Sequence, residues 1–203
     1  SVAVGRESSL ELIRYAEQRG GDAYIAVSCQ VDAAIEVPTM GDIYPTGTLA
    51  KVLRVVEIPN HHPTAILQSF GRISLSPEPT RINPFLRTHV STLPEELPEE
   101  NDAEFKALFE TFREATLQYI KLNENLGMEA FMAVQNISNP IFFINFVATN
   151  LPFDTEEKAL LLEDGNMMSR TFSLLRILQR ELQFVKLKQK ISERTREELD
   201  QQQ

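Results

Sequence analysis

Apolar residues recur at three- and four-residue steps through the last third of the chain. The residues of this stripe are Phe172, Leu174, Leu175, Ile177, Leu178, Leu182, Phe184, Val185 and Ile191. Neither glycine nor proline occurs from residue 167 to residue 203, so the pattern predicts one helix of roughly 55 Å. We expect the stripe up to Ile191 to pack in a bundle and the charged remainder to leave it. Such a helix needs a partner or a continuation, so we interpret the chain as a piece of a longer protein.

Helical patterning also precedes this long helix. Asn101 or Asp102 can cap a helix that carries Phe105 and Phe112, and Asp154 is a capping residue for a later one. Shorter helices are expected at 129–136, 140–148 and 156–163, and we assign Phe142, Phe143 and Phe146 to their core. The second half of the chain is therefore predicted to be a helical bundle.

The first half has the pattern of a small β-rich unit. An early helix with Leu10, Ile13 and Ala16 on one face ends at a pair of glycines, and nine of the 11 prolines precede Glu99. Strands are predicted at 24–30, 48–58, 64–75 and 85–93. We expect a β-rich subdomain over 1–94, a polar linker over 95–102 and a bundle over 103–203 whose long helix begins at about residue 167.

Short motifs in a fixed order carry a family resemblance. They are the run from Val4 to Leu10, Val31-Asp32, Pro38-Thr39, Asp42-Ile43-Tyr44, Gly47-Thr48, the run from Leu151 to Lys158, Arg170 and the run from Leu178 to Leu182. Each is weak alone, but their order over about 200 residues resembles the amino-terminal domain of Lon, the ATP-dependent protease, especially its bacteroidete form.

The resemblance implies an α+β fold in which a PUA-like pseudo-barrel is followed by a helical bundle. The family has a strand before the element at Gly5, and the chain begins almost at that element. We therefore expect the first strand of the pseudo-barrel to be missing, which leaves an unprotected edge or an apolar groove.

The resemblance also implies a non-catalytic role in protein quality control. Lon as a family is a hydrolase with a Ser-Lys dyad and works as a hexamer, but its ATPase and protease parts follow the region that this chain resembles. We therefore expect no catalytic residue and no cofactor in the chain, with ATP and Mg bound by the absent ATPase domain. The expected partners are unfolded or damaged polypeptides and other copies of the same subunit.

Composition and charge limit the kinds of partner and the cellular location that we expect. A net charge of -9 and a pI near 4.9 disfavour nucleic acid, whose phosphates require clustered Lys and Arg. The longest apolar run, 141–148, is too short to span a bilayer and no signal peptide is evident, so no membrane partner is expected. A single cysteine, Cys29, cannot form an intramolecular disulfide, which favours a reduced, cytoplasmic location.

Motifs for chemistry are scarce. The chain has no P-loop, no Gly-x-Ser-x-Gly elbow and no His-Glu-x-x-His helix, and we expect no small-molecule ligand. His61-His62 lies in a turn without a nearby Cys or Asp, which argues against a metal site. Cys29 is expected to be buried in a strand, and the Glu156-Glu157 pair to interact with a helix dipole.

Apolar residues in turn-like places are the best candidates for contact with polypeptides, because such contact needs exposed apolar side chains on a rigid support. These candidates are Met40, Ile43, Tyr44, Phe70 and Phe85. Ordinary core packing is the more common role for residues of these types. The leading hypothesis is a substrate-recognition domain that also supports hexamer assembly. The alternative is a module that acts mainly by self-association through the long helix.

Overall fold

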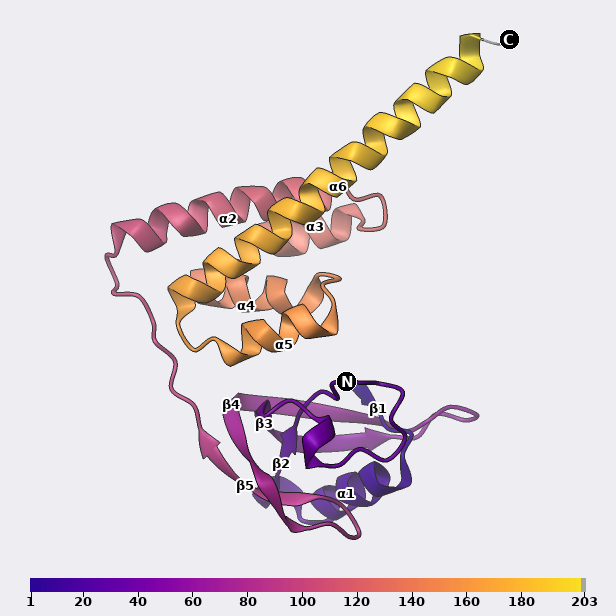
Figure 1. The fold of residues 1–203 in the computed structure, drawn as a ribbon, viewed down its shortest axis with the longest axis vertical. Coiled ribbons are helices and arrows are strands. Elements are labelled where there is room, and N and C mark those ends of the chain that lie inside the picture. Colours follow the sequence, from indigo (N-terminus) through magenta and orange to yellow (C-terminus); the bar gives the residue numbers. More distant parts are fainter. Residues whose placement is uncertain (202–203) are drawn as a thin grey trace. The chain divides into compact units, whose positions relative to one another are not determined.

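The computed structural model describes residues 1–201, and Gln202 and Gln203, the end of the predicted long helix, lie outside the described residues. The chain divides into two compact units, Ser1–Pro94 and a second that begins at Glu95. The first contains an antiparallel sheet and the second is helical (Figure 1). The α+β class expected from the sequence is thus confirmed.

The first unit consists of one sheet and a covering helix. Its elements are β1 (Val2–Ala3), α1 (Glu7–Gln18), η1 (Gly20–Asp22), β2 (Tyr24–Val27), η2 (Met40–Asp42), β3 (Thr46–Val56), β4 (Thr64–Arg81) and β5 (Arg87–Thr92). Hydrogen bonding gives the strand order β1-β4-β3-β2, with β5 also paired to β4. The described strands therefore form no closed ring, and β2 has a strand neighbour only on its β3 side.

Helix α1 covers one face of this sheet. Ile13 and Ala16 of α1 pack in one buried cluster with Ile25 of β2 and Ala50 of β3. Ile25 and Ala50 are directly opposite each other in the β2–β3 ladder. Side chains alternate across a strand, so the neighbouring pair in the ladder must point to the other face. The face away from α1 therefore carries different residues, Tyr24 and Lys51 among them.

Strand β4 is longer than predicted. The sequence indicated a strand end at Leu75, because Pro77 and Pro79 follow it, but β4 continues to Arg81. Beyond Ser74 the strand is paired with β5 alone. A strand with a single neighbour tolerates proline, since the missing amide can lie on the unpaired side. The two prolines thus mark an edge segment of β4 and not a turn.

The second unit is a bundle in which the helix starts are set by side-chain caps. Its helices are α2 (Ala103–Leu122), α3 (Met128–Gln135), α4 (Pro140–Asn150), α5 (Thr155–Glu163) and α6 (Met167–Gln201). Asp102 accepts hydrogen bonds from the backbone amides of Glu104 and Phe105, and Asp154 accepts one from Glu157. These bonds satisfy amides that have no partner within the helix, and both capping residues agree with the sequence prediction.

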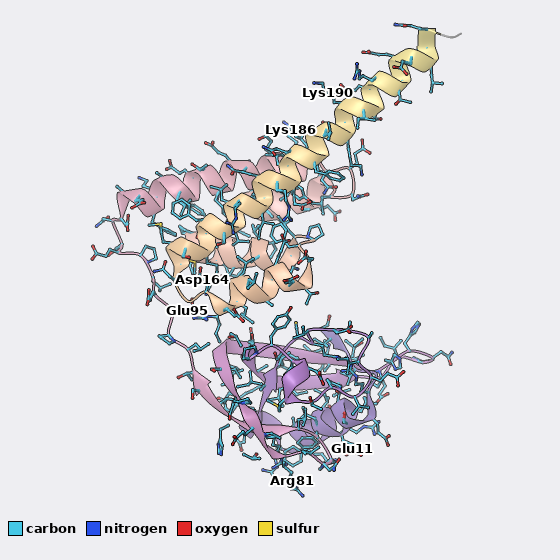
Figure 2. The ribbon with its side chains drawn as sticks, in the orientation of Figure 1. Glu11, Arg81, Glu95, Asp164, Lys186 and Lys190 are labelled. Atoms are coloured by element: carbon cyan, nitrogen blue, oxygen red, sulfur yellow. The ribbon has the colours of Figure 1, made fainter. Side chains whose placement is uncertain are left out.

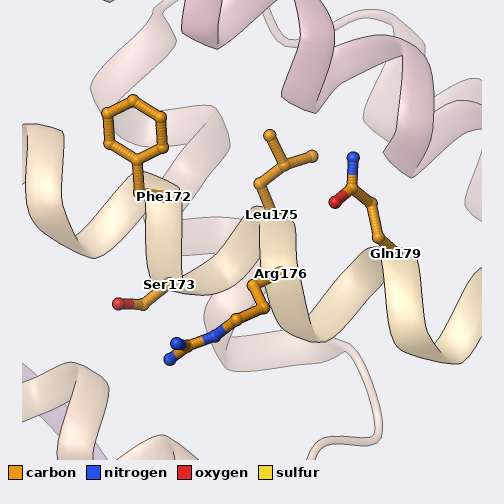
Figure 3. Close-up of a pocket in the computed structure, with 5 residues that line it drawn as sticks. All are labelled: Phe172, Ser173, Leu175, Arg176 and Gln179. Atoms are coloured by element: carbon orange, nitrogen blue, oxygen red, sulfur yellow. The ribbon is translucent and has the colours of Figure 1, made fainter.

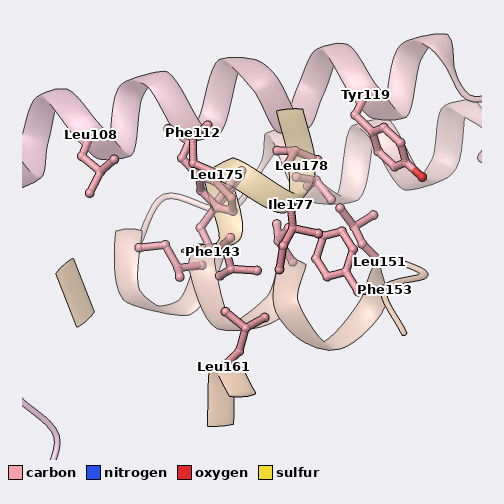
Figure 4. Close-up of a cluster of buried hydrophobic side chains, with 14 of the residues drawn as sticks. Leu108, Phe112, Tyr119, Phe143, Leu151, Phe153, Leu161, Leu175, Ile177 and Leu178 are labelled. Carbon is pink, nitrogen blue, oxygen red and sulfur yellow. The ribbon is translucent and has the colours of Figure 1, made fainter. Parts of the chain in front are cut away.

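The bundle core lies where α2 and α4 meet the first half of α6 (Figure 4). Phe112, Phe143 and Leu178 are fully buried there, and the rings of Phe112 and Phe143 meet edge to face at 5.9 Å. The expected core position of Phe143 is confirmed. Phe142, in contrast, is 58% exposed, so its assignment to the core is wrong. A continuous apolar run does not reveal which side of a helix faces inward.

Helix α6 has a packed half and a free half. Leu182 and Val185 contact the core, and Gln189 Nε2 lies 3.5 Å from the Leu122 carbonyl oxygen of α2. All side chains from residue 190 to residue 201 are exposed. Figure 2 shows Lys186 and Lys190 on the part of α6 that extends from the bundle. The expectation that the whole stripe up to Ile191 packs in the bundle is wrong, because Phe172, Phe184 and Ile191 are exposed.

The segment expected to be a linker begins inside the helical unit. Buried Arg170 of α6 contacts the Glu95 carboxylate at 2.9 Å and donates to the Asp164 carbonyl oxygen, and Figure 2 shows Glu95 and Asp164 near the start of α6. The Met167 amide donates to the Glu96 carbonyl oxygen at 2.9 Å. In the first unit, Arg72 donates to the Pro94 carbonyl oxygen at 2.8 Å. Pro94 and Glu95 are thus held by different units, although they are adjacent in the chain.

Among residues 1–201, no helix is long and apolar enough to cross a bilayer.

Candidate functional site

Phe70 is the sequence candidate that lies in a cluster at the surface. Its ring is 50% exposed and lies 5.6 Å from the ring of Tyr24, which is 52% exposed, in an edge-to-face arrangement. The Lys51 Nζ atom lies 4.5 Å from the Tyr24 ring centroid and 5.6 Å from the Phe70 centroid. We call Tyr24, Lys51 and Phe70 the aromatic–lysine cluster.

Three neighbouring strands position the aromatic–lysine cluster. Tyr24 of β2 is directly opposite Lys51 of β3 in the ladder, next to the buried pair Ile25 and Ala50. Opposed residues of an antiparallel pair share a face, so Tyr24 and Lys51 lie on the face away from α1. Burial on one face of the sheet therefore fixes the exposure of these two side chains on the other.

Phe70 reaches the cluster through a bulge in β4. Leu49 pairs with Gly71 and Ala50 pairs with Ser69, so Phe70 is an extra residue without a partner in the ladder. Gly71 has a φ of 143°, a conformation that residues with a Cβ rarely adopt. A bulge redirects a side chain relative to the regular strand. The sequence Ser69-Phe70-Gly71 thus supplies both the ring and the backbone that turns it outward.

The cluster carries a cation without a counter-ion. Among residues 1–201, Lys51 forms no ion pair and its Nζ atom makes no hydrogen bond to the protein. The negative faces of the two rings attract the ammonium group. The site therefore combines apolar ring surface with a positive charge that is held beside the rings.

Met40, Ile43 and Tyr44 lie at the base of the loop that joins β2 to β3, and all three are half-buried. The Tyr44 amide donates to the Cys29 carbonyl oxygen at 2.9 Å, and Ile43 forms a bridge with Gln30. Ile43 and Tyr44 therefore hold the two arms of the loop together. They are separate from the aromatic–lysine cluster in the contacts that they make.

A capping box stiffens the same loop. The Asp42 carboxylate accepts hydrogen bonds from the Thr39 amide at 2.8 Å and from the Thr39 hydroxyl at 2.9 Å. These bonds, the backbone one first, favour the charged carboxylate and lower the pKa of Asp42. Arg6 donates to the Gln30 side chain and to the Ile35 carbonyl oxygen, which ties the loop to the start of α1.

Phe85 is a core residue and not a surface contact. It is only 6% exposed, and its ring centroid lies 5.5 Å from that of Tyr15 of α1.

Cys29 also differs from expectation, since it is exposed and not buried. The predicted strand ran to residue 30, but β2 ends at Val27 and leaves Cys29 beyond the ladder. Among residues 1–201, no group of three or more His, Cys, Asp or Glu side chains is placed to hold a metal ion.

The polar side chains that line the open groove on α6 do not point toward a common centre. It measures about 330 Å³ and is lined by residues of α6 alone. In Figure 3, Phe172 and Leu175 point to one side of the helix while Ser173 and Arg176 point to the other. The second exposed feature of α6 is an apolar stripe of Phe184, Leu187 and Ile191. By helical periodicity it faces away from Leu182 and Val185, which pack in the bundle.

Comparison of the sequence with known proteins assigns the chain to a family. Residues 1–180 match the sequence model described as the ATP-dependent protease La (LON) substrate-binding domain. The chain is 39% identical over 204 residues to Lon protease from Porphyromonas gingivalis, covering 100% of this chain and 24% of that protein. It is 36% identical over 202 residues to Lon protease from Flavobacterium johnsoniae, again covering 100% of this chain and 24% of that protein. The chain thus spans about a quarter of the length of these curated relatives.

Solved structures agree on the fold. The N-terminal domain of Mycobacterium avium complex Lon protease superposes with a TM-score of 0.66 at 18% identity, covering 90% of this chain and 88% of that chain. A Lon N-terminal domain protein from Xanthomonas campestris gives 0.57 at 15% identity and covers 86% of each chain. The match over residues 1–180 extends through both units and into α6. The chain belongs to the LON substrate-binding domain family.

Proposed function

We propose that this domain captures unfolded or damaged polypeptides for a Lon-type ATP-dependent protease and that it supports assembly of the hexamer. The observation that carries the proposal is the aromatic–lysine cluster, in which two half-exposed rings are fixed on the outer face of a sheet. Unfolded chains expose apolar side chains, and aromatic rings on a rigid support bind them with little loss of conformational entropy.

The chemistry of proteolysis belongs, in this proposal, to parts of the parent protein outside residues 1–203. ATP and Mg would be bound by an ATPase domain, and a Ser-Lys dyad would cleave the substrate. The domain itself would bind weakly and act through several copies, because linked weak sites together give useful avidity. A cytoplasmic location is part of the proposal and is supported by the single unpaired cysteine.

A titration with an unfolded protein tests the capture function. A casein-like chain is titrated into the 203-residue protein, and binding is followed by fluorescence anisotropy while the mass of the complex is measured. We expect the variant with Tyr24→Ser and Phe70→Ser to bind about tenfold more weakly, a loss of roughly 1.4 kcal/mol, since buried aromatic contacts dominate such interfaces.

Phe184→Ser is the matched control for this titration. Phe184 is 59% exposed and lies 5.9 Å from a lysine Nζ atom, but it belongs to α6. The control should bind the unfolded protein as the parent does. Equal binding by the parent and by the Tyr24/Phe70 variant would refute capture at the aromatic–lysine cluster.

The second candidate function is self-association through α6. It is favoured by the exposed stripe of Phe184, Leu187 and Ile191 on the side of the helix away from the bundle. Exposed apolar residues at such spacing are typical of helix partners. If this function is primary, Phe184→Ser lowers the mass of the protein in solution and leaves the binding of unfolded chains unchanged at a fixed oligomeric state.

A further inference from the structure

The aromatic–lysine cluster offers a charge as well as apolar surface. We propose that it selects polypeptide segments in which a large apolar side chain is followed or preceded, two residues away, by a carboxylate. This inference rests on the proposed capture function and specifies which segments are preferred. The occupant is an extended segment of an unfolded protein.

The position of Lys51 determines the charge preference. Its Nζ atom is 4.5 Å from one ring centroid and 5.6 Å from the other, and no described carboxylate forms an ion pair with it. A ligand that covers the rings therefore brings its own neighbouring side chains close to an ammonium group without a counter-ion. A carboxylate there gains an ion pair, whereas a cationic side chain is repelled.

The geometry of an extended chain sets the spacing. Side chains two positions apart point to the same side and are separated by about 6.6 Å, twice the rise per residue. This separation is comparable to the distances from Nζ to the two ring centroids. An apolar side chain on the rings thus places the side chain two residues away beside Lys51. The residue between them points away from the surface.

The two rings also restrict the Lys51 side chain before a carboxylate binds to it. A free lysine loses rotamer entropy when it forms an ion pair, which is one reason why exposed pairs contribute little. Lys51 is half-buried and already attracted to two rings. Less conformational freedom therefore remains to be lost on binding. The expected gain is still modest, because the site is in contact with solvent and screened by salt.

A panel of short unstructured peptides tests the preference with the 203-residue protein. The peptides share one sequence and carry Phe-Gly-Asp, Phe-Gly-Asn or Phe-Gly-Lys at the centre, and dissociation constants are measured at low and at high salt. We expect the Asp peptide to bind about 2- to 5-fold more tightly than the Asn peptide at low salt, with the Lys peptide weakest, and the difference to shrink at high salt.

Variants assign the preference to Lys51. Lys51→Gln should bind the Asp and Asn peptides equally, Lys51→Glu should prefer the Lys peptide, and Lys188→Gln, beside Phe184 on α6, should behave as the parent. Equal binding of the Asp and Asn peptides by the parent, or a preference that survives in Lys51→Gln, overturns the inference alone. Failure of every peptide to bind overturns the capture function and this inference with it.

Discussion

Alanine substitutions at two leucines of α6 should affect stability very differently, because one lies in the bundle and the other is exposed. Leu178 is fully buried in the bundle core, whereas Leu187, nine residues later on the same helix, is 54% exposed. Replacing each leucine by alanine removes the same atoms from the same type of helix. The difference between Leu178→Ala and Leu187→Ala therefore measures the packing at each position and not the helix propensity.

The magnitudes follow from burial. A fully buried leucine replaced by alanine costs about 2–5 kcal/mol, because the apolar transfer free energy is lost and a cavity remains. We expect about 3 kcal/mol for Leu178→Ala, which corresponds to a fall in the melting temperature of roughly 13 °C for a unit of this size. For Leu187→Ala the change should stay within about 0.5 kcal/mol, as for other exposed positions.

Urea unfolding followed by far-ultraviolet circular dichroism measures both variants. The helical signal comes mainly from the second unit, which holds α2 to α6. The two units can unfold separately, so the midpoint of the helical transition is the quantity to compare. Equal losses in the two variants, or a loss above about 1.5 kcal/mol for Leu187→Ala, would refute the conclusion that Leu178 lies in the bundle core and Leu187 outside it.

Two further predictions concern the sheet and the effect of pH. A Cβ at Gly47 would lie 2.5 Å from the Val27 carbonyl oxygen, so Gly47→Ala should lower the free energy of unfolding of the first unit by about 1–3 kcal/mol in calorimetry. Gly21→Ala, where a Cβ meets nothing within 4 Å, is the control, and a similar loss there would contradict the steric explanation. Burial raises the pKa of the Tyr119 phenol, an effect reduced by its hydrogen bond with Asn123. A folded pKa above the unfolded value of about 10 means that this contribution is present below pH 10 and is lost as the pH rises through the folded pKa. Tyr119→Phe should therefore reduce the alkaline loss of stability seen in urea midpoints, and an unchanged pH dependence would argue against this role of Tyr119.

Helix starts were the most predictable part of the fold. The sequence predicted Asn101 or Asp102 as one cap and Asp154 as another, and Asp102 and Asp154 accept the amide hydrogen bonds expected of caps. The reason is that capping is local and depends on a few consecutive residues. The start of the long helix near residue 167 was predictable from the absence of glycine and proline beyond it, and α6 begins at Met167.

The partners of Phe70 were not predictable from the sequence. Tyr24 and Lys51 are far from Phe70 along the chain and meet it only through the register of three strands and a bulge. Register depends on which face of each strand is buried, and that is decided by packing against α1. Gly71 was the available signal, because a glycine inside a strand pattern often marks a bulge.

The buried side of each helix was also not predictable from the sequence. Phe142 and Phe143 are adjacent in one apolar run, yet the first is exposed and the second is fully buried. On α6, Phe184 is exposed whereas its neighbour Val185 is half-buried against the core. Periodicity predicts an apolar stripe, but where a stripe is wide only the positions of neighbouring helices determine which of its sides is covered.

Site-specific photocrosslinking can show directly whether unfolded chains bind at the aromatic–lysine cluster. A benzophenone side chain is placed at position 70 of the aromatic–lysine cluster or, as the matched control, at position 184 of α6, and each protein is irradiated with a casein-like unfolded chain or with a folded protein of similar size. If the aromatic–lysine cluster captures unfolded chains, position 70 cross-links to the unfolded chain, these cross-links are absent with the folded protein, and those from position 184 are much weaker. Cross-links of equal yield from both positions, or none from position 70, would contradict capture at this cluster.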